Sequence, residues 1–195
     1  MPRVLVVNNY PSRERVETLE RCIRGNGAEV VPTELEDVSS RRFDSCDGVV
    51  LSGSPAMLTD PSTPSKFGGE VEAILDSKAP ILGICFGHQL LARAFGAEVV
   101  KDQRHVLEMV KTTVLRADPL FGGLPKTMML LESRYEVVSS LPDGFSLLAR
   151  STTSRIAAMK HPKRLLYGTQ FHPERFTKQD PQGDRVVGNF VRMLK

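Results

Sequence analysis

The sequence predicts an α/β fold built on one sheet, parallel at its centre and extended by antiparallel strands. Short apolar segments alternate with helix-like segments through residues 1–101, which is typical of strand–helix–strand units. Strand-like segments separated only by turns occupy residues 105–174, and a helix-like segment closes the chain at 181–195. A chain of 195 residues is long enough for one sizeable core, so we expect residues 1–195 to form a single domain.

The elements of the first half follow in order. Residues 3–9 form an apolar run typical of a buried strand, and residues 12–27 place apolar side chains at helical spacing before two glycines. We expect further strands at 28–34, 47–55, 79–85 and 97–101, and further helices at 68–78 and 87–95. Residues 58–69 are rich in Pro, Ser and Gly and are expected to form a surface loop.

The second half is expected to contribute antiparallel strands. The strand-like segments are 105–115, 126–138, 145–151, 155–161 and 165–174. Turn sequences such as Leu-Pro-Asp-Gly at 141–144 separate them, so they can pair as an extension or edge of the sheet.

Composition excludes several classes of function. The 26 basic and 23 acidic residues are spread along the chain, and no basic block or aromatic–basic interleaving indicates nucleic-acid binding. No apolar run approaches the roughly 20 residues that span a bilayer, and the N-terminus lacks a signal-peptide pattern. Three cysteines without Cys-x-x-Cys spacing do not indicate a disulfide framework. We therefore expect a cytoplasmic protein with no nucleic-acid or membrane partner.

Cys85 lies between two glycines where an apolar strand meets a helix. The pattern Gly83-x-Cys85-x-Gly87 has the form of the G-x-S-x-G nucleophile elbow, with sulfur in place of oxygen. Such a turn exposes the side chain at the carboxyl end of a parallel strand, where open α/β sheets bind ligands. The helix N-terminus beyond it favours a thiolate. A small cysteine packed between strand and helix is the alternative interpretation of this pattern alone.

A thiol nucleophile needs a base and a group that orients the base. His172 ends an apolar strand, and Glu174 follows two residues later, so an extended backbone directs both side chains to the same side. This pair lies 87 residues after Cys85, and together the segments predict a Cys–His–Glu triad. His105 and His161 are expected to be solvated, and His88 is expected to support the turn. A zinc site from Cys85, His88 and His172 matches no structural zinc spacing, so we expect no metal and no cofactor.

At this point the chain resembles the class I, triad-type glutamine amidotransferases. Gly-Ile-Cys-Phe-Gly-His-Gln-Leu-Leu-Ala at 83–92 and Tyr-Gly-Thr-Gln-Phe-His-Pro-Glu at 167–174 are similar to the two signature segments of that family. Residues 49–55 and 188–194 are similar to its oxyanion strand and final helix. Within the family, residues 130–151 and 156–161 resemble the separate glutaminase subunit of archaeal-type GMP synthase.

The resemblance implies a flavodoxin-like fold and the hydrolysis of glutamine to glutamate and ammonia, which passes to a synthetase partner. Cys85 would be the nucleophile, His172 the acid and base, and Glu174 the group that orients His172. The backbone N–H groups of Phe86 and Ser54 would form the oxyanion hole. By resemblance, Gly53 and Gln89 would bind the substrate glutamine.

Three positions depart from the family pattern. Ser54 replaces a glycine that many relatives have, although a backbone donor needs no particular side chain, and its hydroxyl is expected to serve as an ordinary turn serine. Arg134 and Glu136 replace a histidine and an aspartate at positions that help couple the glutaminase to its synthetase. We expect Arg134, Tyr135 and Glu136 to reach across an interface, with Arg134 pairing with a partner carboxylate.

Three functions stay open from the sequence. The first is a glutaminase that supplies ammonia to a synthetase. The ATP-pyrophosphatase subunit of GMP synthase is one candidate for that partner. The second is a free-standing cysteine hydrolase acting on a γ-glutamyl or other amide, and the third is a non-catalytic relative. Gln89 favours the first over the second, and the complete set Cys85, His172 and Glu174 argues against the third. For the first function we expect low basal activity and a large increase when the partner is added.

Overall fold

The computed structural model describes residues 1–194, which contain nine strands and six α-helices. The strands are β1 (Arg3–Asn8), β2 (Glu29–Glu34), β3 (Gly48–Leu51), β4 (Ile81–Ile84), β5 (Val99–Val114), β6 (Thr127–Val138), β7 (Ser146–Ser151), β8 (Ala158–Lys160) and β9 (Leu166–Thr169). The helices are α1 (Glu17–Gly25), α2 (Ser40–Asp44), α3 (Thr63–Lys66), α4 (Gly68–Asp76), α5 (Phe86–Ala94) and α6 (Gln182–Met193).

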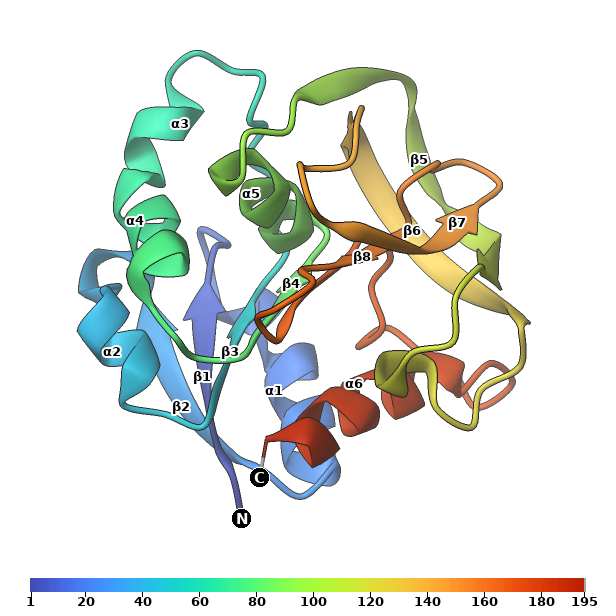
Figure 1. Ribbon diagram of the computed structural model, residues 1–195, viewed down its shortest axis with the longest axis horizontal. Helices are drawn as coiled ribbons and strands as arrows, with labels where there is room; N and C mark the ends of the chain where they lie inside the picture. The colour runs from blue at the N-terminus through green and yellow to red at the C-terminus, as the bar shows by residue number, and fades with distance from the viewer. Residues whose placement is uncertain (195) are drawn as a thin grey trace.

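All of these strands belong to one sheet with two halves. The strand order is β2-β1-β3-β4-β9-β8-β7-β5-β6 (Figure 1). The first five strands in this order pair in parallel, and every pairing from β9 to β6 is antiparallel. The predicted α/β fold class is therefore confirmed, with an antiparallel part as large as four strands.

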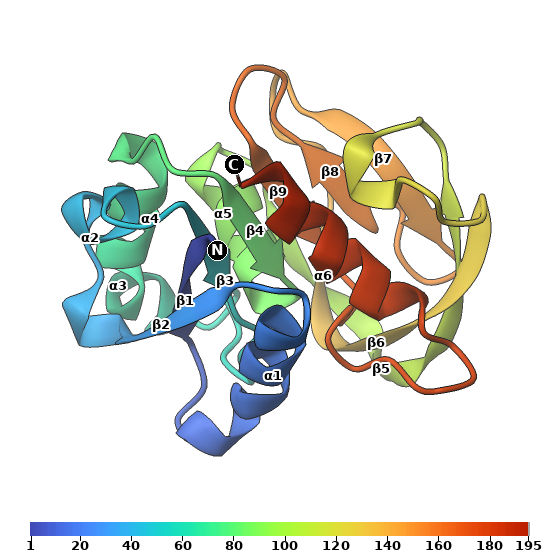
Figure 2. The ribbon, with the colours of Figure 1, turned by 90° about the horizontal axis from the view of Figure 1, so that it is seen from below.

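Helices cover both faces of the parallel half. In β1, Val4 and Val6 pack in a core with α1 and α6, whereas Leu5 and Val7 pack in a second core with α2, α4 and α5. The alternation follows from the strand period of two residues, which directs neighbouring side chains to opposite faces. Figure 2 shows α6 running across the near face of the sheet, with α1 beside it. Burying each such aliphatic side chain contributes about 1.5–3 kcal/mol.

Several element boundaries differ from the sequence predictions. The segments predicted as strands at 97–101 and 105–115 form one strand, β5, whose pairing with β6 shifts between Lys101 and Val106. Helix α2 was not predicted, and its first turn is capped by the Ser39 hydroxyl, which accepts a hydrogen bond from the Arg42 amide. The predicted loop at 58–69 contains the short helix α3. These differences arise because short helices and continuous ribbons depend on tertiary partners more than on local periodicity.

The parallel strands end together at one edge of the sheet. Asn9 and Tyr10 follow β1, Ser52 to Ser54 follow β3, Cys85 follows β4, and His172 lies beyond β9. Adjacent parallel strands bring their carboxyl ends to the same edge, which is where open α/β sheets bind ligands. In the part of the chain that the structure describes, no helix is both long enough and apolar enough to cross a bilayer.

Candidate active site

Cys85 occupies a strained turn between β4 and α5. Its backbone has φ 52° and ψ −100°, and within residues 1–194 it is the only non-glycine residue with a positive φ. A Cβ atom on Gly83 would lie 2.4 Å from the Gly87 carbonyl oxygen, and one on Gly87 would lie 2.5 Å from the Leu51 carbonyl oxygen. Both glycines are therefore required by close backbone approach. Strain of this kind is found where a side chain must be held in a defined position.

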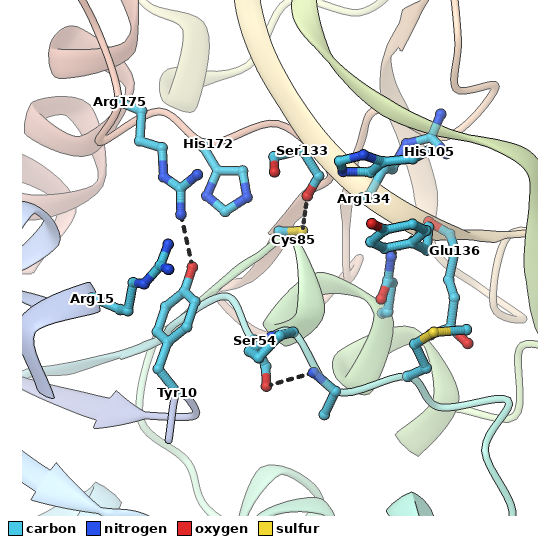
Figure 3. Close-up of a pocket in the computed structure, with 15 residues that line it drawn as sticks. Tyr10, Arg15, Ser54, Cys85, His105, Ser133, Arg134, Glu136, His172 and Arg175 are labelled. Carbon is cyan, nitrogen blue, oxygen red and sulfur yellow. Dashed lines mark hydrogen bonds between the residues drawn. The ribbon is translucent and has the colours of Figure 1, made fainter. Parts of the chain in front are cut away.

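The Cys85 thiol faces a pocket that is also lined by Ser54, Gln89, His172 and residues 134–136 (Figure 3). The side chain is almost fully buried, and Sγ donates a hydrogen bond to the Ser133 carbonyl oxygen at 3.4 Å. The Gln170 amide nitrogen approaches the sulfur at 3.8 Å. Cys22 and Cys46 are also free thiols, but neither lines this pocket.

His172 and Glu174 make the predicted contact. The distance from His172 Nδ1 to Glu174 Oε1 is 2.7 Å, and both side chains are buried. Burial lowers the pKa of His172, but the Glu174 carboxylate and Cys85 outweigh it and raise the value to about 10. Burial raises the pKa of Glu174, but His172 and Arg175 outweigh it and hold that pKa below its usual value. The raised pKa of His172 and the lowered pKa of Glu174 favour an imidazolium paired with a carboxylate.

His88 is a different kind of histidine. It is fully buried on α5 beneath the turn, and burial lowers its pKa to about 3. A Cβ atom on Gly168 would lie 2.4 Å from its Nδ1 atom, so it packs against β9. This position fits the expectation that His88 supports the turn. Within residues 1–194, no group of three or more His, Cys, Asp or Glu side chains is arranged to hold a metal ion.

Of the two predicted oxyanion donors, Ser54 lines the pocket and Phe86 is the neighbour of a lining residue. Phe86 follows Cys85 directly, and Ser54 lies on the facing wall. Within residues 1–194, neither backbone N–H donates a hydrogen bond to another protein group. The Ser54 hydroxyl donates to the Asn9 carbonyl oxygen at 2.7 Å and accepts from the Ala56 amide at 3.1 Å. This hydroxyl fixes the turn, as expected for a turn serine.

Of the two predicted substrate-binding residues, Gln89 lines the pocket, and Gly53 packs against Tyr10 and His172, which line it. Gln89 is buried one turn along α5, and its Nε2 atom donates to the Glu136 carbonyl oxygen at 2.8 Å and to Gln170 Oε1 at 3.2 Å. Gly53 packs closely beneath the base, because a Cβ atom there would lie 2.9 Å from His172 Cε1 and 2.5 Å from the Tyr10 hydroxyl.

The expected reach of Arg134 and Glu136 toward a partner is corrected by the structure. The Arg134 side chain is 1% exposed and pairs with Glu132 at 2.8 Å and with Asp102, and it also donates to the Thr153 carbonyl oxygen at 2.6 Å. The Glu136 carboxylate is buried and accepts from the amides of Leu58 and Thr59, at 2.7 and 2.8 Å. Internal hydrogen bonds therefore occupy both charged groups.

Tyr135 is the exposed member of the predicted coupling group. Its side chain is 52% exposed, and its ring stacks on His105 with centroids 4.1 Å apart and planes 10° from parallel. Both residues line the pocket. Sequence reasoning missed His105 here, because its position opposite Tyr135 depends on the pairing of β5 with β6.

Tyr10 and Arg175 are further pocket residues that sequence reasoning missed. The Arg175 guanidinium donates to the Tyr10 hydroxyl at 3.1 Å on the His172 side of the pocket (Figure 3). Burial raises the pKa of Tyr10 to about 12, so its hydroxyl stays protonated at neutral pH. The adjacency of Arg175 to Glu174 and of Tyr10 to the end of β1 was the only available sequence signal.

Comparison with known proteins agrees with this geometry. Residues 5–194 match the family model described as glutamine amidotransferase class-I. A glutamine-hydrolyzing GMP synthase subunit of Pyrococcus abyssi is 35% identical over 186 residues, covering 91% of this chain and 92% of that protein. The corresponding protein of Methanothermobacter thermautotrophicus is 35% identical over 195 residues, covering 98% of each chain.

Solved structures show the same similarity. The crystal structure of a candidate GMP synthase subunit from Thermoplasma acidophilum superposes with a TM-score of 0.85 at 32% identity, covering 100% of this chain and 94% of that one. A Thermotoga maritima glutamine amidotransferase shares the fold, with a TM-score of 0.75 at 20% identity over 90% of this chain and 77% of that one. The chain belongs to the class I glutamine amidotransferase family.

Proposed function

We propose that this chain is the glutamine-hydrolysing subunit of a GMP synthase, acting as one domain and delivering ammonia to a separate synthetase subunit. The observation that carries the proposal is the buried His172–Glu174 pair, with 2.7 Å between Nδ1 and Oε1, whose histidine lines the pocket that holds the Cys85 thiol. The relatives are named as glutamine-hydrolysing subunits of GMP synthases, and this supports a GMP synthase as the enzyme that uses the ammonia. A cytoplasmic location is part of the proposal, favoured by three cysteines that remain free.

In the first half-reaction, the Cys85 thiolate attacks the side-chain amide carbon of glutamine. The electron pair of the carbonyl moves to oxygen, and the N–H groups of Phe86 and Ser54 stabilise the resulting oxyanion. His172 then gives its proton to the leaving nitrogen as the C–N bond breaks, which releases ammonia and leaves a γ-glutamyl thioester on Cys85.

In the second half-reaction, neutral His172 takes a proton from water, and the hydroxide attacks the thioester carbon. The same two N–H groups stabilise the second oxyanion, and the C–S bond breaks to release glutamate and regenerate the Cys85 thiolate. Glu174 keeps the His172 ring oriented and stabilises its charged form through both steps. Gln89 and the backbone at Gly53 hold the substrate glutamine beside the nucleophile.

Coupling to the partner is assigned to Arg134, Tyr135 and Glu136 together. Tyr135 can contact a partner directly, because its side chain is exposed at the pocket. Arg134 and Glu136 would act through the position of β6, since the carbonyl oxygen of neighbouring Ser133 holds the Cys85 thiol. The partner is expected to change this segment rather than to pair with either charge.

The test is glutamate release by the purified chain, alone and with a GMP synthase ATP-pyrophosphatase subunit. Cys85→Ala should lower release by about 10⁴-fold or more while the fold is kept. Cys46→Ala is the matched control, because Cys46 lies outside the pocket and should retain wild-type release. Undiminished glutamate release by Cys85→Ala would falsify the mechanism. Hydrolysis of γ-glutamyl peptides but not of glutamine would favour the free-standing hydrolase.

A further inference from the structure

The peptide between Gly53 and Ser54 has a defined orientation. The Ser52 hydroxyl donates a hydrogen bond to the Gly53 carbonyl oxygen at 2.9 Å. In a planar trans peptide the C=O and N–H bonds point in opposite directions. The Ser54 N–H therefore points away from Ser52. Ser54 borders the pocket that holds Cys85, whereas Ser52 is 1% exposed and lies outside its lining.

Ser52 is itself held by the segment that follows β1. The Asn9 backbone amide donates to Ser52 Oγ at 2.9 Å, which leaves the hydroxyl proton for the Gly53 carbonyl oxygen. The Asn9 side-chain Nδ2 atom donates to Glu70 Oε1 at 3.1 Å and approaches the Ser52 carbonyl oxygen at 3.4 Å. One chain of hydrogen bonds thus runs from α4, through the end of β1, to the peptide beside the pocket.

Glu70 is the buried origin of this chain, and the proposed reaction does not use it. Its side chain is fully buried on α4, and within residues 1–194 its Oε2 atom has no hydrogen-bond partner. Burial raises the pKa of Glu70 to about 8, although the Asn9 hydrogen bond opposes this, so the carboxyl is mainly protonated at neutral pH. Burying a carboxyl group is costly, which makes an otherwise unused one notable.

We infer that Glu70, Asn9 and Ser52 are positioning residues that hold the Gly53–Ser54 peptide with its N–H toward the pocket, so that this oxyanion donor is in place without a partner. The inference rests on the proposed function. No rotation of this peptide is then needed to complete the oxyanion hole. A partner would then control the active site through the β6 side of the pocket.

The test compares Ser52→Ala with wild type by kcat and KM for glutamine, using the full chain with and without the partner subunit. Loss of the hydroxyl frees the peptide, so kcat should fall by about 10-fold or more, short of the roughly 10²–10³-fold loss for removing one oxyanion donor. KM should stay within about 2-fold, because the donor acts on the transition state. Alkylation of Cys85 by iodoacetamide should keep its wild-type rate, since that reaction forms no oxyanion.

Ser77→Ala is the matched control. Ser77 is a buried serine whose hydroxyl donates to Asp44 Oδ1 at 2.7 Å, and it lies outside the pocket lining. Its loss should lower stability and leave kcat unchanged. If Ser52→Ala does not fold, two variants of Glu70 test the hydrogen bond between Glu70 and Asn9 instead. Glu70→Gln keeps an oxygen acceptor for Asn9 and should keep kcat within about 2-fold, whereas Glu70→Leu removes the acceptor and should lower kcat as Ser52→Ala does.

The outcomes separate this inference from the proposed function. Wild-type kcat in a folded Ser52→Ala, or a rise in KM with unchanged kcat, would overturn the inference and leave the glutaminase intact. Wild type that hydrolyses no glutamine with or without the partner would overturn the proposed function instead. In that case the same variants are compared in Cys85-dependent hydrolysis of p-nitrophenyl acetate, where equal rates for Ser52→Ala and wild type would overturn the inference.

Discussion

Two walls of the pocket differ in how they are held. The loop after β3, residues 52–59, is fixed by buried groups of its own chain, with Ser52, Asn9 and Glu70 behind the Gly53–Ser54 peptide. The facing segment of β6, residues 133–136, carries the exposed Tyr135 and reaches the thiol through the Ser133 carbonyl oxygen. The difference teaches that one wall is held by buried groups of its own chain, while the wall that carries an exposed residue is the one that contacts the Cys85 thiol.

Removing the buried Arg134 side chain from the β6 wall should have the largest effect on the free energy of unfolding. Arg134→Ala leaves the fully buried Glu132 carboxylate without its cation, so the free energy of unfolding should fall by about 3–5 kcal/mol. Denaturant unfolding measures this. Arg104→Ala is the control, because its pair with Glu108 is exposed and its loss should leave the free energy of unfolding nearly unchanged. Equal losses for the two variants would show that Arg134 is not a structural ion pair.

Breaking the loop wall should harm activity more than stability. In Gly53→Ala the new Cβ atom would meet His172 Cε1 and the Tyr10 hydroxyl, so the base must shift and kcat should fall by about 10²-fold. Steady-state glutamate release measures this change. Gly69→Ala is the control, since nothing lies within 4 Å of a Cβ atom there. A Gly53→Ala enzyme with wild-type kcat would mean that the loop does not set the position of His172.

The link between the walls can be weakened at Glu136. Its carboxylate accepts from the backbone amides of Leu58 and Thr59, and Glu136→Gln keeps only one side-chain oxygen for the two donors. We expect the unfolding free energy to fall by about 1–3 kcal/mol, and hydrogen exchange of both amides to quicken. Unchanged exchange at those amides would show that the β6 wall does not hold the loop.

The pH dependence of stability sharpens the assignment of Glu70. Its pKa is raised by burial to about 8 in the folded protein, above the unfolded value of about 4.3. The folded state therefore holds the proton more tightly, and the resulting stability is present below about pH 4.3 and lost as pH rises through about 8. Glu70→Gln does not titrate, so wild type should lose stability relative to this variant between about pH 5 and about 8. If the unfolding free energies of wild type and Glu70→Gln changed equally over that pH range, this would contradict a buried neutral carboxyl.

The sequence predicted the reacting groups better than their surroundings. The glycines on either side of Cys85 indicate a turn in which backbone segments approach closely. The two-residue spacing of His172 and Glu174 brings their side chains together when the segment is extended. Both signals are local. The interior position of Arg134 was not predictable, because Asp102 and Thr153 reach it only through the pairing of β5, β6 and β7.

The supporting network was hidden for a similar reason. Asn9, Ser52 and Glu70 lie far apart in the sequence, and each resembles an ordinary polar residue at the end of a strand or on a helix. Only the parallel register of β1 with β3, and the packing of α4 beneath them, brings the three together. Patterns of period 2 or 3.6 locate elements, but they carry no information about such contacts between elements.

The central claim is that the Gly53–Ser54 peptide is in place as an oxyanion donor without a partner. The most direct test is to trap the acyl-enzyme with hydroxylamine, using the isolated chain and glutamine. Hydroxylamine competes with water for a thioester, so an acyl-enzyme yields γ-glutamyl hydroxamate. We predict that hydroxamate forms with no partner present, and that Cys85→Ala forms none. Formation only after a synthetase subunit is added, or persistence of the hydroxamate in Cys85→Ala, would contradict it.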